Sequence, residues 1–255
     1  MRYLKCYFSV LAVLAMTLPV WAQRGSVGSG RYDQQIEQNV NKVLQANDKW
    51  KGITASTDDA IVTLDGNVNL YIDKEDARRK VSKIDHVQGV RNRVQVASSV
   101  PDSELRQKLS DKLAYDRIGY GIAFNNLTLN VQNGTVTVGG QVHDYPSRDS
   151  AIAIVETTPG VKDVIDDITV LPTSTFDDDL RIRVARAIYG SPTLQKYAMD
   201  PQKPIRIIVN NGHVTLDGVV DSQMDSQIAE TQAKSVPNVF SVKNNLVIAG
   251  NQQPK

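Results

Sequence analysis

The sequence predicts an α+β protein built from three tandem α-β-β-α-β modules, each with a three-stranded mixed sheet and two helices on one face. An eight-residue segment occurs three times, beginning at Ile61, Thr135 and His213, with offsets of 74 and 78 residues. A recurrence of this length indicates one supersecondary unit used repeatedly. Around each copy, alternating apolar and polar residues predict strands, and apolar residues at helical spacing predict amphipathic helices. The modules are expected at residues 32–97, 103–171 and 177–248.

The second module shows this pattern most clearly. Leucines from Leu105 to Leu113 lie at helical spacing, and two alternating segments follow at 127–131 and 135–138. Between these segments, Asn133-Gly134 readily adopts the positive φ angles of a tight hairpin turn. A second helix and a last strand follow, and a right-handed crossover makes that strand parallel to the second strand.

The first module is less regular than the other two. Asp58-Asp59 stands where the other modules have an Asn-Gly turn, and the stretch from Gly66 to Gly89 carries about three more residues than its expected equivalents. Each module has about 70 residues, a size at which a single core is only marginally sufficient. We therefore expect neighbouring modules to pack on one another.

The N-terminus predicts a secretory signal peptide over residues 1–22. Arg2 and Lys5 precede an apolar run from Phe8 to Val20, and Val20-Trp21-Ala22 is the expected cleavage site. The run is shorter than the roughly 20 residues that a spanning helix needs. We expect the mature protein to lie in the periplasm or outside the cell, without a membrane span. A flexible leader and a tail are expected at residues 23–31 and 249–255.

Composition excludes several classes of function. The net charge is +1, and removal of Arg2 and Lys5 with the signal peptide gives 1 − 2 = −1. No segment is basic enough to indicate binding to nucleic acid. The one cysteine, Cys6, lies in the predicted signal peptide, so the mature chain has no disulfide, thiol nucleophile or thiolate ligand.

The repeated segment, Val-Thr-Leu-x-Gly-x-Val in its clearest form, is followed by a helix, a Gly-Val or Asn-Val pair and a last strand, and resembles the BON domain of bacterial osmotically inducible and envelope proteins. This resemblance covers nearly all of the mature chain. It implies an envelope-facing module that binds phospholipid surfaces, with no catalysis and no cofactor. Asn also tolerates positive φ, so its replacement of glycine in the third pair is compatible with the fold. The residues that carry the motif are Gly66, Gly140, Gly218, Gly89, Gly160 and Asn238.

Other candidate chemical sites do not converge. His86, His143 and His213 occupy different positions in the repeat, whereas metal ligands must meet at one point. Acidic residues 177–179 fit a helix start, where negative charge is favourable. The glycine-rich segment 25–30 lacks the lysine and preceding strand of a phosphate loop. We predict no catalytic residue, no metal and no cofactor.

Membrane contact is the more specific prediction. Aromatic residues beside Lys or Arg suit a lipid interface, where an amphipathic ring lies at headgroup level. The same aromatic residues could instead fill the cores or the gaps between modules. The candidate contacts are Lys49, Trp50, Lys51, Arg117, Tyr120, Tyr197 and Lys203.

The predicted function is non-enzymatic: binding phospholipid headgroups, or supporting envelope integrity under stress. One alternative is a scaffold that binds an envelope protein, because small sheets expose edge strands that accept a partner strand. A second alternative is sensing of a small ion or small ligand.

Overall fold

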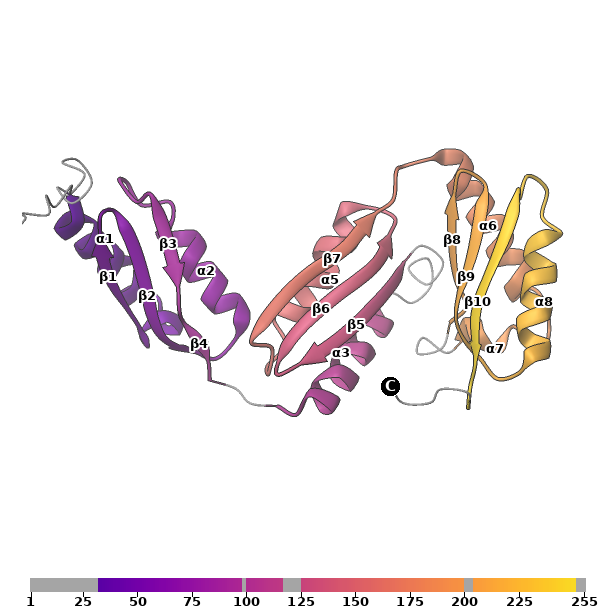
Figure 1. Ribbon diagram of the computed structural model, residues 1–255, viewed down its shortest axis with the longest axis horizontal. Coiled ribbons are helices and arrows are strands. Elements are labelled where there is room, and N and C mark those ends of the chain that lie inside the picture. The colour runs from indigo at the N-terminus through magenta and orange to yellow at the C-terminus, as the bar shows by residue number, and fades with distance from the viewer. Residues whose placement is uncertain (1–31, 98–99, 117–124, 200–203, 251–255) are drawn as a thin grey trace, which may run out of the picture.

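The computed structural model describes residues 32–97, 100–116, 125–199 and 204–250. These residues form three modules that follow one another along a curved chain (Figure 1). The predicted signal peptide and leader lie outside the described residues, as does the tail beyond residue 250. Within the described ranges, no helix combines the length and apolarity needed to cross a bilayer.

Each module has the predicted α-β-β-α-β order. The first comprises α1 (Asp33–Gln45), the short 3₁₀ helix η2 (Asp48–Trp50), β1 (Ile53–Asp58), β2 (Ile61–Val68), α2 (Tyr71–Val81), β3 (Gly89–Asn92) and β4 (Gln95–Val96). The second comprises α3 (Asp102–Asp116), β5 (Asn126–Gln132), β6 (Thr135–Val142), α5 (Tyr145–Glu156) and β7 (Asp163–Val170). The third comprises α6 (Thr175–Tyr189), α7 (Lys196–Met199), β8 (Arg206–Asn210), β9 (His213–Val220), α8 (Gln223–Lys234) and β10 (Ser241–Ile248).

The sheets are mixed, as predicted. In each module the first two strands form an antiparallel hairpin, and the last strand runs parallel to the second. The two long helices of a module cover the same face of its sheet (Figure 1). Apolar side chains of the strands point toward those helices, while Thr128 and Asn130 lie exposed on the other face of the second sheet.

The pairing register corrects the expected irregularity of the first module. In all three modules, the first residue of the second strand pairs with a residue 28 positions later, so the first module has no insertion. The positive-φ residue before the last strand is accordingly His86 in the first module, equivalent to Gly160 and Asn238, and not Gly89. The pairs that define this register are Ile61 with Gly89, Thr135 with Asp163, and His213 with Ser241.

The hairpin turn of the first module also differs from the expectation. Asp58 still pairs with Ile61, so the turn residues are Asp59 and Ala60, with φ angles of 51° and 60°. Asn133-Gly134 and Asn211-Gly212 adopt the same conformation in the other modules. The predicted turn at Asp58-Asp59 is therefore displaced by one residue.

An aspartate in the first turn of each module's first helix holds the hairpin. Its two carboxylate oxygens accept hydrogen bonds from the backbone N–H groups of the two turn residues. Charge-assisted hydrogen bonds of this kind are stronger than neutral ones. Asp177 therefore belongs to the hairpin clamp of the third module, consistent with its expected place at a helix start. The pairs are Asp33 with Asp59 and Ala60 (3.1 and 2.9 Å), Asp102 with Asn133 and Gly134 (2.6 and 2.9 Å), and Asp177 with Asn211 and Gly212 (2.8 and 2.9 Å).

The recurring glycine of the second strand lies against the backbone of the first strand. A Cβ atom on Gly66 would lie 2.0 Å from the carbonyl oxygen of Gly52. On Gly140 and Gly218 the corresponding distances are 2.0 and 2.6 Å, and all three glycines have positive φ. Only glycine fits this position without moving the strands apart.

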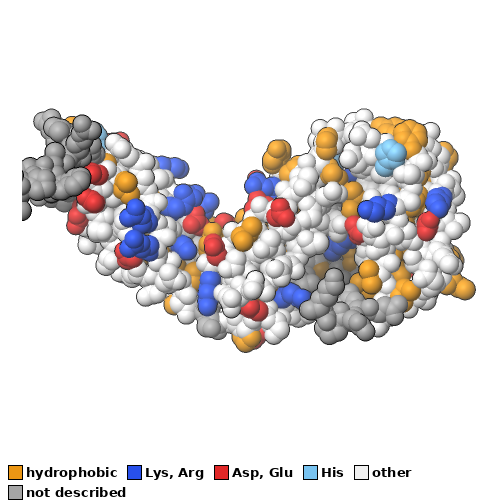
Figure 2. Space-filling model, viewed as in Figure 1, with side chains coloured by type: hydrophobic (Ala, Val, Ile, Leu, Met, Phe, Trp, Pro, Cys, Tyr) orange, Lys and Arg blue, Asp and Glu red, His pale blue; other side chains and the backbone are white. Residues whose placement is uncertain are grey.

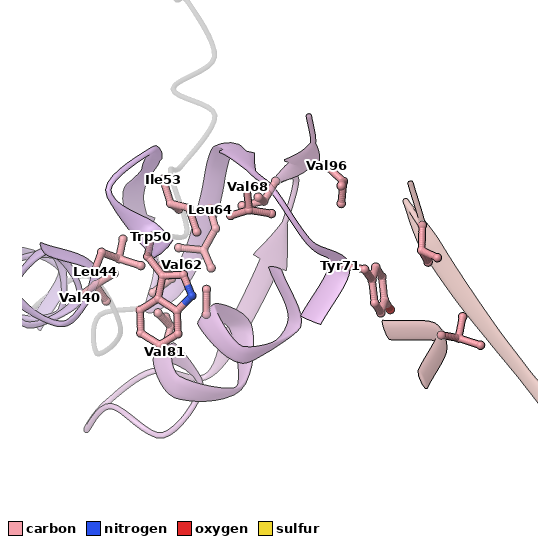
Figure 3. Close-up of a cluster of buried hydrophobic side chains, with 14 of the residues drawn as sticks. Val40, Leu44, Trp50, Ile53, Val62, Leu64, Val68, Tyr71, Val81 and Val96 are labelled. Atoms are coloured by element: carbon pink, nitrogen blue, oxygen red, sulfur yellow. The ribbon is translucent and has the colours of Figure 1, made fainter. Parts of the chain in front are cut away.

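Buried side chains form two clusters. One spans the first and second modules, and Tyr71 lies at its edge, pointing from the start of α2 toward the neighbouring module (Figure 3). The other belongs to the third module. The first two modules therefore share a continuous core, which confirms the expected packing for this pair.

Polar contacts join the second and third modules. The Asn126 side chain donates to Asp217 over 2.9 Å, and Arg206 donates to the carbonyl oxygen of Asn125 over 2.8 Å. His143 also lies 3.3 Å from Asp178. The start of β5 thus rests on the third module's sheet.

Candidate functional site

Trp50 and Tyr197, the two aromatic candidates among the described residues, are buried in module cores. Trp50 is 8% exposed, and its indole N–H donates to the carbonyl oxygen of Asp73 over 3.0 Å. Tyr197 is 2% exposed; its hydroxyl donates to Asp225 over 2.5 Å and accepts from the backbone of Asp221. Of the two predicted alternatives, contact with lipid or packing in a core, the burial of both rings matches packing in a core. Their faces are not available to a lipid surface.

The lysine beside each of these aromatics pairs with a buried carboxylate. Lys49 lies 3.2 Å from Asp73, and Lys196 lies 3.0 Å from Asp225. Both aspartates occupy the third position of the module's second helix. Burial acts to raise the pKa of Asp225, but hydrogen bonds from Tyr197 and Lys196 outweigh it and lower the pKa below its ordinary value. The Lys-aromatic pairs are therefore structural in both modules.

The remaining predicted contacts are either paired or outside the described residues. Lys51 is exposed and lies 2.6 Å from Asp48, which offsets its charge. Arg117, Tyr120 and Lys203 lie outside the described residues.

The first module carries a different group of exposed cations. Lys80 and Lys83 lie at and just beyond the C-terminal end of α2, and Arg91 and Arg93 lie on and just after β3. We call these four residues the α2–β3 basic surface. None of the four makes an ion pair with a carboxylate within the described part of the chain. Lys and Arg side chains gather over this part of the first module (Figure 2).

The pattern of an aromatic residue beside a cation does not predict this surface, because no Phe, Trp or Tyr is adjacent to any of its four cations in the sequence. The signal was nevertheless present, since residues 71–97 contain seven Lys and Arg but only four Asp and Glu. Two of the seven, Arg78 and Arg79, pair with acids one helical turn away. Counting charge in windows shorter than a module would have found the excess.

The three histidines do not form a site. His86 stacks on Tyr32 with ring centroids 4.0 Å apart, His143 faces Asp178, and His213 lies 2.8 Å from the Ser241 hydroxyl. Among the residues that the structure describes, no three His, Cys, Asp or Glu side chains are grouped so that they can hold a metal ion.

The repeated architecture has a counterpart among known families. The BON domain matches three tandem segments of this chain, at residues 32–98, 101–172 and 177–250. The chain belongs to the BON domain family. The repeated glycine of each copy is the one that lies against the backbone of the first strand, so this part of the family motif sets the close approach of the two strands.

Individual relatives are more distant. Osmotically inducible protein Y of Escherichia coli strain K12 is 26% identical over 155 residues, covering 59% of this chain and 74% of the relative. Among solved structures, CdsD, a structural protein of the type III secretion system of Chlamydia trachomatis, aligns at 14% identity and a TM-score of 0.25, covering 84% of this chain and 92% of CdsD. The PrgH periplasmic domain aligns at 12% identity and a TM-score of 0.21, covering 78% and 94%.

Proposed function

We propose that this BON-domain protein is a non-enzymatic envelope component that binds anionic phospholipid surfaces through its first module. The observation that carries the proposal is the α2–β3 basic surface, whose four cations are exposed and lack carboxylate partners in the described chain. Family membership and the similarity to osmotically inducible protein Y support a role in the envelope under osmotic stress.

The charge distribution favours one orientation on such a surface. Residues 99–172 contain six Lys and Arg and ten Asp and Glu, a net charge of −4. An anionic membrane therefore attracts the α2–β3 basic surface and repels the second module. The first module faces the lipid, and the others extend away from it.

The expected affinity is modest. One Lys or Arg near an anionic leaflet contributes about 1 kcal/mol, so the four cations contribute about 4 kcal/mol. This corresponds to a dissociation constant on the order of 1 mM. Because the attraction is electrostatic, it weakens as salt shortens the Debye length to about 8 Å at physiological ionic strength.

Vesicle co-sedimentation tests the proposal. The protein is mixed at low salt with vesicles rich in phosphatidylglycerol or with pure phosphatidylcholine vesicles, and only the former should retain it. A variant with Lys80, Lys83, Arg91 and Arg93 replaced by Gln should lose most of this binding.

A matched control removes the same charge elsewhere. Arg106, Lys108, Arg186 and Lys243 are also exposed, and their replacement by Gln should leave most of the binding intact. An equal loss of vesicle binding in both variants would show that binding depends on the net charge of the protein and not on the α2–β3 basic surface. No binding of the unchanged protein to phosphatidylglycerol at low salt would refute the proposed function.

A further inference from the structure

The contact between the first two modules has two sides. The first module contributes Tyr71, the first residue of its second helix, at the end opposite its hairpin turn; we call this end the presenting side. The second module contributes the end that holds its own hairpin turn, the last residue of α5 and the first residue of β7; we call this end the receiving side. Tyr71 is buried, and its pKa is raised by burial and then by the charges of nearby acids that include Asp163 and Glu156. Arg79, two turns along α2, also lies near Glu156.

The second module carries the same presenting side, but it is uncovered. Tyr145 is the first residue of α5 and the equivalent of Tyr71, and it is 67% exposed. The third module leaves this ring exposed, although contacts of β5 with the third module's sheet and of His143 with Asp178 hold the two modules together.

The third module carries the same receiving side, and it is uncovered as well. Phe240 is 67% exposed, packs beside Gly212 of the hairpin turn and meets the His213 ring edge-on at 5.9 Å. Phe176, 44% exposed, precedes the aspartate that clamps the same turn. Apolar side chains gather near a histidine at this end of the third module (Figure 2).

Charge complementarity matches these two sides. On the receiving side, the position that Glu156 holds in the second module is occupied in the third module by Lys234, the last residue of α8. On the presenting side, Asp149 replaces Glu75. Asp149 and Lys234 have opposite charges, and each is exposed and pairs only with a side chain on its own helix among the described ion pairs.

We propose that two copies of this chain form a twofold dimer. In this dimer, the Tyr145 end of each copy docks on the Phe176–Phe240 end of the other copy. The two ends lie on the same side of the chain, because β7 ends and α6 begins there, joined by residues 171–174 (Figure 1). Two copies related by a twofold axis can therefore make the contact twice. Each contact covers three partly exposed aromatic rings of about 150–250 Å² each, which places the dimer among small, weak interfaces.

Sedimentation velocity over a concentration series tests the dimer. The unchanged protein should shift from monomer to dimer with rising concentration, and Tyr145→Ser or Phe240→Ser should weaken dimerisation at least tenfold. Tyr115→Ser, which removes another exposed aromatic ring at the end of α3, should leave dimerisation unchanged.

Complementation separates the proposed contact from misfolding. In a twofold dimer, each serine variant alone loses both contacts, but an equimolar mixture of Tyr145→Ser and Phe240→Ser restores one contact. The mixture should therefore dimerise more strongly than either variant. Asp149→Lys should also weaken dimerisation, and adding Lys234→Asp in the same chain should restore it.

Three results would overturn the proposal. The first is a monomer at every concentration whose sedimentation coefficient is the same in Tyr145→Ser, and the second is a dimer that both serine variants leave intact. The third is a concentration-independent monomer whose sedimentation coefficient changes in Tyr145→Ser, which would show docking within one chain. None of these results bears on vesicle binding, which uses different residues.

Discussion

Replacing Gly66 with alanine should strongly destabilise the first module. Gly66 has a φ of +128°, a conformation that costs an L residue about 1–3 kcal/mol. Its added Cβ would lie 2.0 Å from the carbonyl oxygen of Gly52, so β1 and β2 must separate there. That separation weakens the nearby hydrogen bond from Asn67 N–H to Gly52, 3.2 Å long, and each such bond contributes about 1 kcal/mol. The strain and the weakened hydrogen bond together give an expected loss of about 2–4 kcal/mol.

Gly89→Ala provides the matched control in the same module. Gly89 has no positive φ, and its Cβ would meet only the Ile61 side chain at 3.9 Å. The free energy of unfolding should therefore change by less than about 0.5 kcal/mol, or rise slightly as the unfolded chain loses entropy.

Urea titration followed by tryptophan fluorescence measures both variants. Trp50 is buried in the first module, and Trp21 is removed with the predicted signal peptide, so the fluorescence of the mature chain reports on this module. For slopes of about 1–3 kcal/mol per molar urea, Gly66→Ala should lower the midpoint by at least about 0.7 M. Equal midpoints for Gly66→Ala and Gly89→Ala would refute the close-approach explanation.

Three further predictions follow from the contacts described above. Asp102→Asn removes the charge from the hairpin clamp and should lower the free energy of unfolding by about 1–3 kcal/mol, measured by urea denaturation; an unchanged midpoint would contradict the clamp. Because Asp225 has a lowered pKa in the folded state, its contribution is present above the ordinary aspartate pKa of about 3.9 and is lost as pH falls through the folded-state pKa. Tyr197→Phe should weaken this acid dependence of the melting temperature, and an unaltered pH profile would contradict it. Asn126→Ala combined with Arg206→Ala should loosen the joint between the second and third modules and increase the radius of gyration in small-angle X-ray scattering; no change would show that other contacts fix the joint.

The module architecture could be predicted because its signals are local. Hairpin turns, alternating strands and the recurring glycine all lie within the eight-residue repeat or beside it. The positive-φ position before the last strand was harder to place, since it holds His86, Gly160 and Asn238 in the three modules. These residues share a backbone conformation but no side-chain chemistry. The sequence pattern therefore aligned Gly89 with Gly160 and Asn238, although the equivalent residue is His86, three positions earlier.

The candidate membrane contacts were harder still to predict, because the exposure of a side chain depends on partners that are distant in the sequence. Trp50 and Tyr197 look like interfacial residues until Asp73 and Asp225, more than 20 positions later in the sequence, engage the same groups. A cation next to an aromatic residue does not show whether the ring turns inward. The contacts between modules were equally hidden, since Tyr71 and Tyr145 begin equivalent helices but only Tyr71 is buried.

Amide chemical-shift mapping against nanodiscs that contain phosphatidylglycerol tests the proposed membrane-facing role of the first module most directly. Signals should shift or broaden at residues 80–93, around the α2–β3 basic surface, and return to their original positions when salt is raised. Perturbations confined to the second and third modules, or equal perturbations with phosphatidylcholine nanodiscs, would contradict this account.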